Sequence, residues 1–180
     1  MPISVKDSQS KLKPTKLGIG MIILILSWYG MEAVHELGHV VHALASGGIV
    51  NSVSIPLWGI SCTHINPNPY AAFVVWGGPI WGSLIPITLW LVVKKYFRQP
   101  LLMSVAAFFA GFCCIANGAY LGIGWMDRVG DAGDLMREGV SVGWLIGFGM
   151  IACVSGLIIW HLWTNELRKK SVGQAVTDKV

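Results

Sequence analysis

The chain has 180 residues, of which 54% are hydrophobic and 12% are charged, and its mean hydropathy is +0.62. Water-soluble domains carry about twice this fraction of charged residues, and disordered chains are far less apolar. Four cysteines in this length also exclude a disulfide-rich mini-protein. The net charge of +4 is the difference between 13 basic and 9 acidic residues, and the distribution of the basic residues along the chain indicates membrane orientation and no nucleic-acid partner. The composition therefore predicts a protein that crosses the membrane several times.

Four segments of the chain are long and apolar enough to cross a bilayer, whose core of about 30 Å takes roughly 20 residues of helix. The first begins at Leu17 and continues as one long helix until Gly47 and Gly48, and the others cover about 71–93, 101–125 and 140–163. The predicted fold class is an all-α polytopic membrane protein of about four transmembrane helices. Residues 1–16 and 164–180 are expected to be tails around one helical domain, 17–163.

Basic residues alternate between the predicted spans. Four precede the first span, none lies between the first and second, three follow the second, two follow the third and four follow the fourth. The positive-inside rule therefore predicts that both termini are cytoplasmic. The alternative for the first span is a signal peptide cleaved after Ala43-Leu44-Ala45, but its long leading region and its glutamates and histidines are poor signal chemistry.

The first predicted span contains the motif H-E-x-x-H, formed by His35, Glu36 and His39. At about 100° per residue, both histidines leave the helix on one face, one turn apart, and can bind one zinc ion. Glu36 points to the neighbouring side, where it can take a proton from a metal-bound water. Such residues are expensive to desolvate and usually carry function in a membrane helix, although placement in the outer headgroup region is the alternative.

A catalytic zinc needs a third protein ligand and an open position for water. An acidic segment at 127–138, between the third and fourth spans, is predicted on the outer side of the membrane, as is the H-E-x-x-H motif. A solvated acidic loop is the alternative reading of that segment. Of the other candidates, His42 lies too far along the helix from His35 to share its metal, and His64 is expected to be a loop bystander. Glu32 could orient an imidazole or lie at the membrane edge.

The sequence HELGH at 35–39, Gly77-Gly78-Pro79 in the second span and the segment Asp131-Ala-Gly-Asp134 resemble the site-2-protease-like intramembrane zinc metalloproteases. The resemblance covers most of the helical chain. It implies one zinc ion per chain, held by His35, His39 and an aspartate, and peptide-bond cleavage within or beside the bilayer. Asp131 fits the family's aspartate best and Asp134 is the first alternative. Ala132 stands where the family has glycine.

Residues 48–65, between the first two spans, are rich in valine, serine and aliphatic residues and predict short strands or a hairpin. The resemblance implies a β element beside the active site, whose free edge could receive an extended substrate. A structural loop that caps the bundle is an equal alternative. Asn117 lies upstream of the aspartate, where the resemblance implies substrate contact and a helix–helix hydrogen bond is the alternative.

The predicted function is a zinc-dependent intramembrane endopeptidase in which Glu36 activates zinc-bound water. Its partners are membrane lipid and a membrane-associated protein or peptide substrate. The alternative is a non-proteolytic metal-binding membrane protein with a transport or regulatory role, although holding a metal requires no glutamate at position 36. A structural membrane subunit without a metal is a third possibility, and it requires the acidic segment to lie far from His35.

Overall fold

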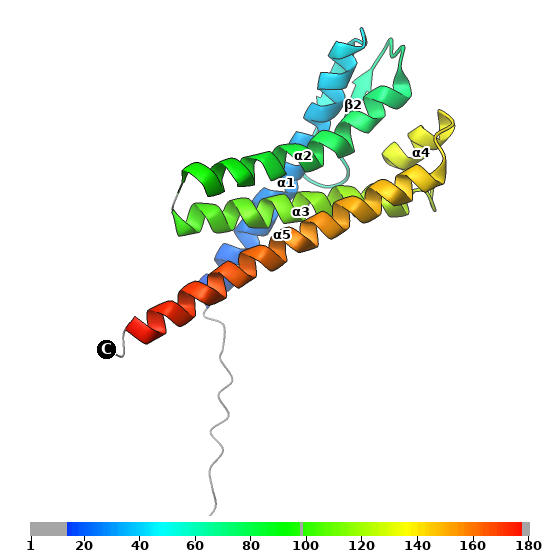
Figure 1. The fold of residues 1–180 in the computed structure, drawn as a ribbon. Helices are drawn as coiled ribbons and strands as arrows, with labels where there is room; N and C mark the ends of the chain where they lie inside the picture. The colour runs from blue at the N-terminus through cyan, green and yellow to red at the C-terminus, as the bar shows by residue number, and fades with distance from the viewer. Residues whose placement is uncertain (1–13, 98, 178–180) are drawn as a thin grey trace, which may run out of the picture.

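The computed structural model describes residues 14–97 and 99–177, which form five helices and one two-stranded sheet (Figure 1). Four of the helices are long and apolar enough to cross a membrane, and the sheet lies between the first two, so the predicted fold class is confirmed. In chain order the elements are α1 (Pro14–Ala45), β1 (Val50–Ser54), β2 (Cys62–Ile65), α2 (Ala71–Tyr96), α3 (Pro100–Gly124), α4 (Gly130–Arg137) and α5 (Val142–Thr177).

Helix α1 ends where the paired glycines were predicted to stop it. Gly47 adopts a φ of +80°, which is costly for residues with a side chain. The amides of Ser46 and Gly48 donate to the carbonyl oxygens of His42 and Ala43, so the last turn of the helix keeps its hydrogen bonds. The chain then reverses into the β1–β2 hairpin, which returns toward the face of α1 that carries the H-E-x-x-H motif.

Helices α1 and α2 cross at a pair of glycines. A Cβ atom at Gly38 would lie 2.1 Å from the carbonyl oxygen of Gly77, and one at Gly77 would lie 2.4 Å from that of Gly38. Between membrane helices such close backbone approach supplies van der Waals packing in place of a hydrophobic driving force. The crossing brings α2 against the motif face of α1.

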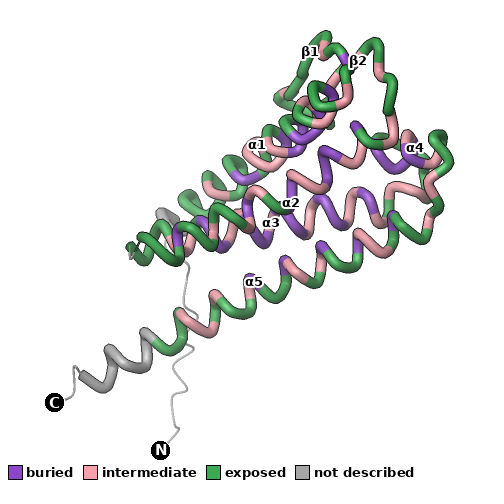
Figure 2. Tube along the Cα trace, turned by 45° about the horizontal axis from the view of Figure 1, so that its top comes forward, coloured by how far each residue is buried: buried purple, intermediate pink, exposed green. Residues whose placement is uncertain are grey.

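Helix α3 lies between α2 and α5, and α2 and α3 are the most buried of the four candidate spans (Figure 2). The α3–α5 crossing is again built on glycine, since a Cβ atom at Gly149 would lie 2.7 Å from the carbonyl oxygen of Gly118. Of the Gly-x-x-x-Gly pairs in the sequence, Gly118 and Gly122 therefore pack against α5. At Gly147, by contrast, an added Cβ atom would meet no atom of another described element within 4 Å. The outer faces carry many exposed large apolar side chains, as contact with lipid requires.

Two elements differ from the predicted organisation. Helix α5 begins at Val142 but continues to Thr177, well beyond the predicted end of the fourth span at Trp163. Hydropathy detects only the apolar part of a helix, and the polar residues after Trp163 are mostly good helix formers. Helix α4 occupies eight residues of the segment expected to be an acidic loop, and it is too short and too polar to register as a span.

The β1–β2 hairpin and α4 lie at one end of the molecule, opposite the C-terminus (Figure 1). The strands pair antiparallel, from Val50 opposite Ile65 to Ser54 opposite Cys62. The hydroxyl of Tyr29 on α1 donates to the carbonyl oxygen of Leu57 at 2.8 Å, which ties the tip of the hairpin to that helix. The hairpin therefore lies along α1 beside the motif.

Candidate metal centre

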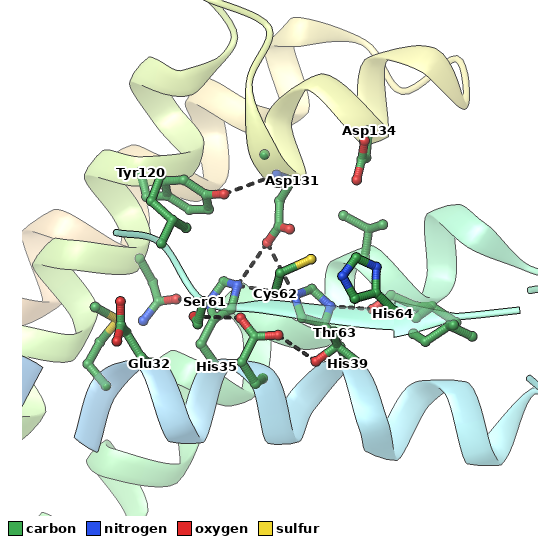
Figure 3. A pocket seen from close by; sticks show the side chains of 18 of the residues that line it. Glu32, His35, His39, Ser61, Cys62, Thr63, His64, Tyr120, Asp131 and Asp134 are labelled. Atoms are coloured by element: carbon green, nitrogen blue, oxygen red, sulfur yellow. Dashed lines mark hydrogen bonds and ion pairs between the residues drawn. The ribbon is translucent and has the colours of Figure 1, made fainter. Parts of the chain in front are cut away.

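Three side chains from two elements converge beside the C-terminal part of α1. His35 and His39 rise from α1, and Asp131 of α4 points toward them from the opposite side (Figure 3). The Nε2 atoms of the histidines are 3.1 Å apart, and they lie 2.9 Å (His35) and 3.5 Å (His39) from Oδ2 of Asp131. Neighbouring ligands of a tetrahedral zinc ion are about 3.3 Å apart, given bonds of about 2.0–2.2 Å. The three side chains are spaced to hold one metal ion.

The other ring nitrogen of each histidine has a hydrogen-bond partner that fixes its tautomer. Nδ1 of His35 lies 2.6 Å from Oδ1 of Asn117, and the amide nitrogen of Asn117 donates to the carbonyl oxygen of Cys113, which fixes the orientation of that amide. Nδ1 of His39 lies 3.0 Å from the carbonyl oxygen of Val74. Because both partners are acceptors, each Nδ1 carries a proton, and each Nε2 is the nitrogen that points toward Asp131.

Two ring nitrogens and a carboxylate oxygen therefore face one another in a buried site. Oδ2 of Asp131 is buried and has no hydrogen-bond partner. Burial raises the pKa of Asp131, but the imidazoles of His35 and His39 beside it lower the pKa more, and the net value is below the usual range. The carboxyl group is thus ionised at neutral pH. The three side chains could hold a divalent metal ion.

Gly78 of α2 has no side chain and therefore leaves space for the Nε2 atoms of His35 and His39. A Cβ atom at this position would lie 2.4 Å from Nε2 of His39 and 2.6 Å from Nε2 of His35. No side chain larger than that of glycine fits there without moving the imidazoles. Because α1 and α2 cross closely, the backbone of α2 at Gly78 lies directly against the ligand nitrogens.

Asp131 is held in place by the turn between α3 and α4. Its backbone N–H donates to the hydroxyl of Tyr120 at 3.2 Å. Gly130 has a φ of +53°, and a Cβ atom there would overlap the Tyr120 hydroxyl at 1.7 Å. Asp131 also lies in the first turn of α4, where the helix dipole favours a negative charge. The turn therefore delivers this carboxylate to the histidines.

The structure separates Asp131 from the other candidate ligands. Asp134 lines the same cavity, but its carboxylate pairs with Arg137 and lies outside the ligand group. His42 stacks on Phe73 and bonds to the Phe73 carbonyl oxygen at 2.6 Å. His64 belongs to β2 and also lines the cavity without joining the group.

Glu36 is buried beside the ligand group and is held by the hairpin. Its carboxylate oxygens accept hydrogen bonds from the hydroxyls of Ser61 at 2.6 Å and Thr63 at 2.5 Å. The family resemblance implies a β element beside the site, but it identifies neither hydroxyl. The signal in the sequence that could have found Ser61 and Thr63 is their spacing, because residues two apart on an extended chain face the same side.

These residues border a cavity of about 770 Å³, formed by α1, β2, α2, α3 and α4. His35, Glu36, His39 and Asp131 all line it, together with the hairpin residues from Ile60 to Ile65. The acidic segment therefore lies next to His35, as a metal site requires. The cavity has room for part of a polypeptide beside the ligand group.

Searches against known proteins show no family for this chain: no protein-family model, no curated protein and no solved structure matches it. The resemblance to site-2-protease-like proteins therefore rests on the motif residues. What the molecule itself adds is the arrangement of His35, His39 and Asp131, which no single stretch of sequence contains.

Proposed function

We propose that this protein is a zinc-dependent intramembrane endopeptidase of the site-2-protease-like kind, which hydrolyses peptide bonds of a membrane-associated protein. The observation that carries the proposal is the convergence of two ring nitrogens and one ionised carboxylate in a cavity that Glu36 also lines. Two histidines and one carboxylate, with a fourth position left open, are a ligand set of hydrolytic zinc sites. Nitrogen and oxygen ligands at this spacing favour zinc over magnesium or calcium, which prefer oxygen alone.

In this proposal the residues divide the chemistry between them. Zinc held by His35, His39 and Asp131 supplies Lewis acidity toward the scissile carbonyl group. Glu36 takes a proton from the attacking water and returns it to the leaving amine. The two hydroxyls on its carboxylate hold it in the orientation that proton transfer needs. A protein that only stored or carried a metal would not need a carboxylate fixed in this way.

Strand β2 supports a polypeptide as substrate. Among the described strands β2 pairs with β1 alone, so its second edge is unpaired. A substrate segment that adds to this edge would be extended, and its peptide groups would be free of helical hydrogen bonds. Glu36 is bonded to residues of the same segment, at 61 and 63, so a strand bound there lies close to the general base.

The same bundle supports an orientation in the membrane. Lys94 and Lys95 end α2 at the same end of the molecule as the C-terminal part of α5, and Lys94 pairs with Glu166 of α5 at 2.5 Å (Figure 1). By the positive-inside rule we propose that this end of the bundle is cytoplasmic. The ligand group then lies in the outer half of the membrane, below the hairpin and α4.

A cleavage assay tests the proposal. Zinc-loaded protein in detergent is incubated with an unfolded polypeptide, reduced casein, and the new termini are identified by mass spectrometry. We expect cleavage by the wild type, none by Glu36→Gln at unchanged zinc content, and loss of cleavage on chelation. Glu166→Gln is the matched control, because this exposed glutamate lies far along α5. Equal cleavage by Glu36→Gln, or none by zinc-loaded wild type, would overturn the proposal.

A further inference from the structure

Glu32 is a second buried carboxylate in the cavity and is not used by the metal centre. It lies one turn before His35 on α1 and rises on the same side (Figure 3). Only 3% of its surface is exposed, and its Oε2 atom has no hydrogen-bond partner. It does not orient either imidazole, because Asn117 and Val74 hold those rings. Its carboxylate therefore faces the cavity with unused acceptor capacity.

The surroundings of Glu32 supply donors but no counter-charge. The Trp28 indole and the backbone N–H of Ser61 lie beside it, and Glu36 places a like charge four residues further along the helix. Like charges at this spacing destabilise a helix. None of the described residues that line the cavity is lysine or arginine, and the whole segment from Leu17 to Val93 contains neither.

A charge balance of the cavity points to a missing cation. Three of its carboxylates, on Glu32, Glu36 and Asp131, have no lysine or arginine opposite them among the described residues, whereas Asp134 is paired with Arg137. A divalent metal ion neutralises two of the three negative charges. Glu32 then lies buried in a membrane span with an unpartnered oxygen, and acidic residues inside a span commonly serve function.

We propose, resting on the endopeptidase function above, that Glu32 forms a subsite for a basic side chain, lysine or arginine, of the substrate polypeptide. Glu32 lies three residues from His35, or about 4.5 Å along the helix. An extended chain advances about 3.3 Å per residue, so the basic residue lies one or two positions from the scissile bond.

Trp28 completes this subsite. It lines the same cavity and lies beside Glu32. Its ring offers an apolar wall for the methylene stem of lysine or the plane of a guanidinium, while the Glu32 carboxylate accepts from the cationic head. A charge-assisted hydrogen bond in a water-poor site is stronger than its neutral counterpart, so the subsite selects a basic side chain over an apolar one of equal length.

Peptide binding tests the subsite independently of cleavage. The probes are fluorescent peptides of one sequence in which a single lysine is moved position by position, each paired with a peptide that carries norleucine there. They are titrated by anisotropy into the zinc-loaded Glu36→Gln protein in detergent. At one position we expect the lysine peptide to bind at least about tenfold more tightly. Adding Glu32→Gln removes this preference, whereas Asp134→Asn, the matched lining carboxylate already paired with Arg137, leaves it intact.

The outcomes separate the subsite from the endopeptidase function. No preference for lysine at any position, or a preference that survives Glu32→Gln at full zinc content, would overturn the subsite even if the wild type cleaves casein. A preference that depends on Glu32, in a protein that cleaves nothing, would support the subsite and overturn the peptidase. If Glu32→Gln does not fold, Glu32→Asp takes its place. This variant shortens the side chain by one methylene, so the preference for the lysine peptide must weaken.

Discussion

Asn117 orients His35 from a different helix, and this sets a quantitative expectation. Replacing Asn117 by alanine leaves Nδ1 of His35 without its acceptor, so neither the tautomer nor the ring orientation is fixed. Loss of such a partner lowers metal affinity about 10- to 100-fold. The affinity is measured by zinc competition with a chelator in detergent.

A suitable control for this variant is Asn165→Ala. Asn165 also bonds to a histidine ring, at 2.9 Å from Nε2 of His161, but on the exposed C-terminal part of α5. Its replacement should leave the zinc affinity unchanged. Equal affinities for Asn117→Ala and the wild type would show that the amide does not hold the ligand.

Gly78 gives a steric prediction at the same site. In Gly78→Ala the new methyl group would lie within 2.6 Å of both ligand nitrogens, so the imidazoles must move apart and zinc binding should be lost. Gly147→Ala, on a face with open space, is the control and should bind one zinc per chain. Zinc content after dialysis distinguishes them, and full zinc in Gly78→Ala would contradict the geometry.

Local sequence could identify some of these residues and not others. His35, Glu36 and His39 stand in one motif whose helical spacing already places the histidines on one face. Asp131 was preferred to Asp134 through resemblance alone, and the turn at Gly130 and Tyr120 now gives the physical reason. The role of Asn117 depends on which helix α3 packs against, which no local pattern specifies.

At the scale of elements, the hairpin is expected to support catalysis and not metal binding. Ser61 and Thr63 donate to both oxygens of Glu36, so a Ser61→Ala, Thr63→Val double variant frees this carboxylate to rotate. Hydrogen bonds to charged groups contribute about 1.5–3 kcal/mol each, so casein cleavage should fall at least about tenfold at unchanged zinc content.

The matched control for the hairpin variant is Thr88→Val. Thr88 donates its hydroxyl to the carbonyl oxygen of Leu84 within α2, at an exposed position. Cleavage by this variant should equal that of the wild type. Wild-type cleavage by the double hairpin variant would mean that Glu36 is positioned by other contacts.

The elements themselves were predictable to different degrees. Long apolar runs determine α1, α2, α3 and the first part of α5, because a bilayer sets both the length and the polarity of a span. Hydropathy carries no such signal for α4 or for the end of α5, which are polar. The antiparallel pairing of β1 and β2 agrees with the predicted hairpin, but its contact with Glu36 is tertiary.

At the scale of the whole molecule, glycine determines how closely the spans approach. The sequence contains several Gly-x-x-x-Gly pairs of equal appearance, yet only some face a neighbouring helix. A Cβ atom at Gly118 would run into α5, whereas one at Gly147 would meet no described element within 4 Å. Which pairs pack depends on the rotation of each helix in the bundle, so the arrangement of the spans could not be predicted from the pairs alone.

The proposed orientation predicts where Cys62 reacts. This exposed thiol lies on the hairpin, so a membrane-impermeant maleimide should label it from outside intact cells. Burial raises the pKa of Cys62, and the carboxylates of Glu36 and Asp131 raise it further. The thiolate fraction is therefore lower than usual at neutral pH, and labelling should keep accelerating as the pH rises above about 8.5.

The opposite end of the bundle provides the control for orientation. Lys95→Cys, in a chain that also carries Cys62→Ser, should react only after the membrane is permeabilised, because Lys95 lies in the last turn of α2, on the side proposed to be cytoplasmic. Labelling of Lys95→Cys in intact cells, with Cys62 protected in the wild type, would reverse the proposed orientation.

Zinc content is the first measurement to make, because every proposed role of the cavity depends on the metal centre. Elemental analysis of detergent-purified protein should find one zinc per chain in the wild type and in Asp134→Ala, and none in His35→Ala or Asp131→Ala. If no preparation binds metal even after zinc is added, or if Asp134→Ala loses it and Asp131→Ala does not, the proposed centre is wrong.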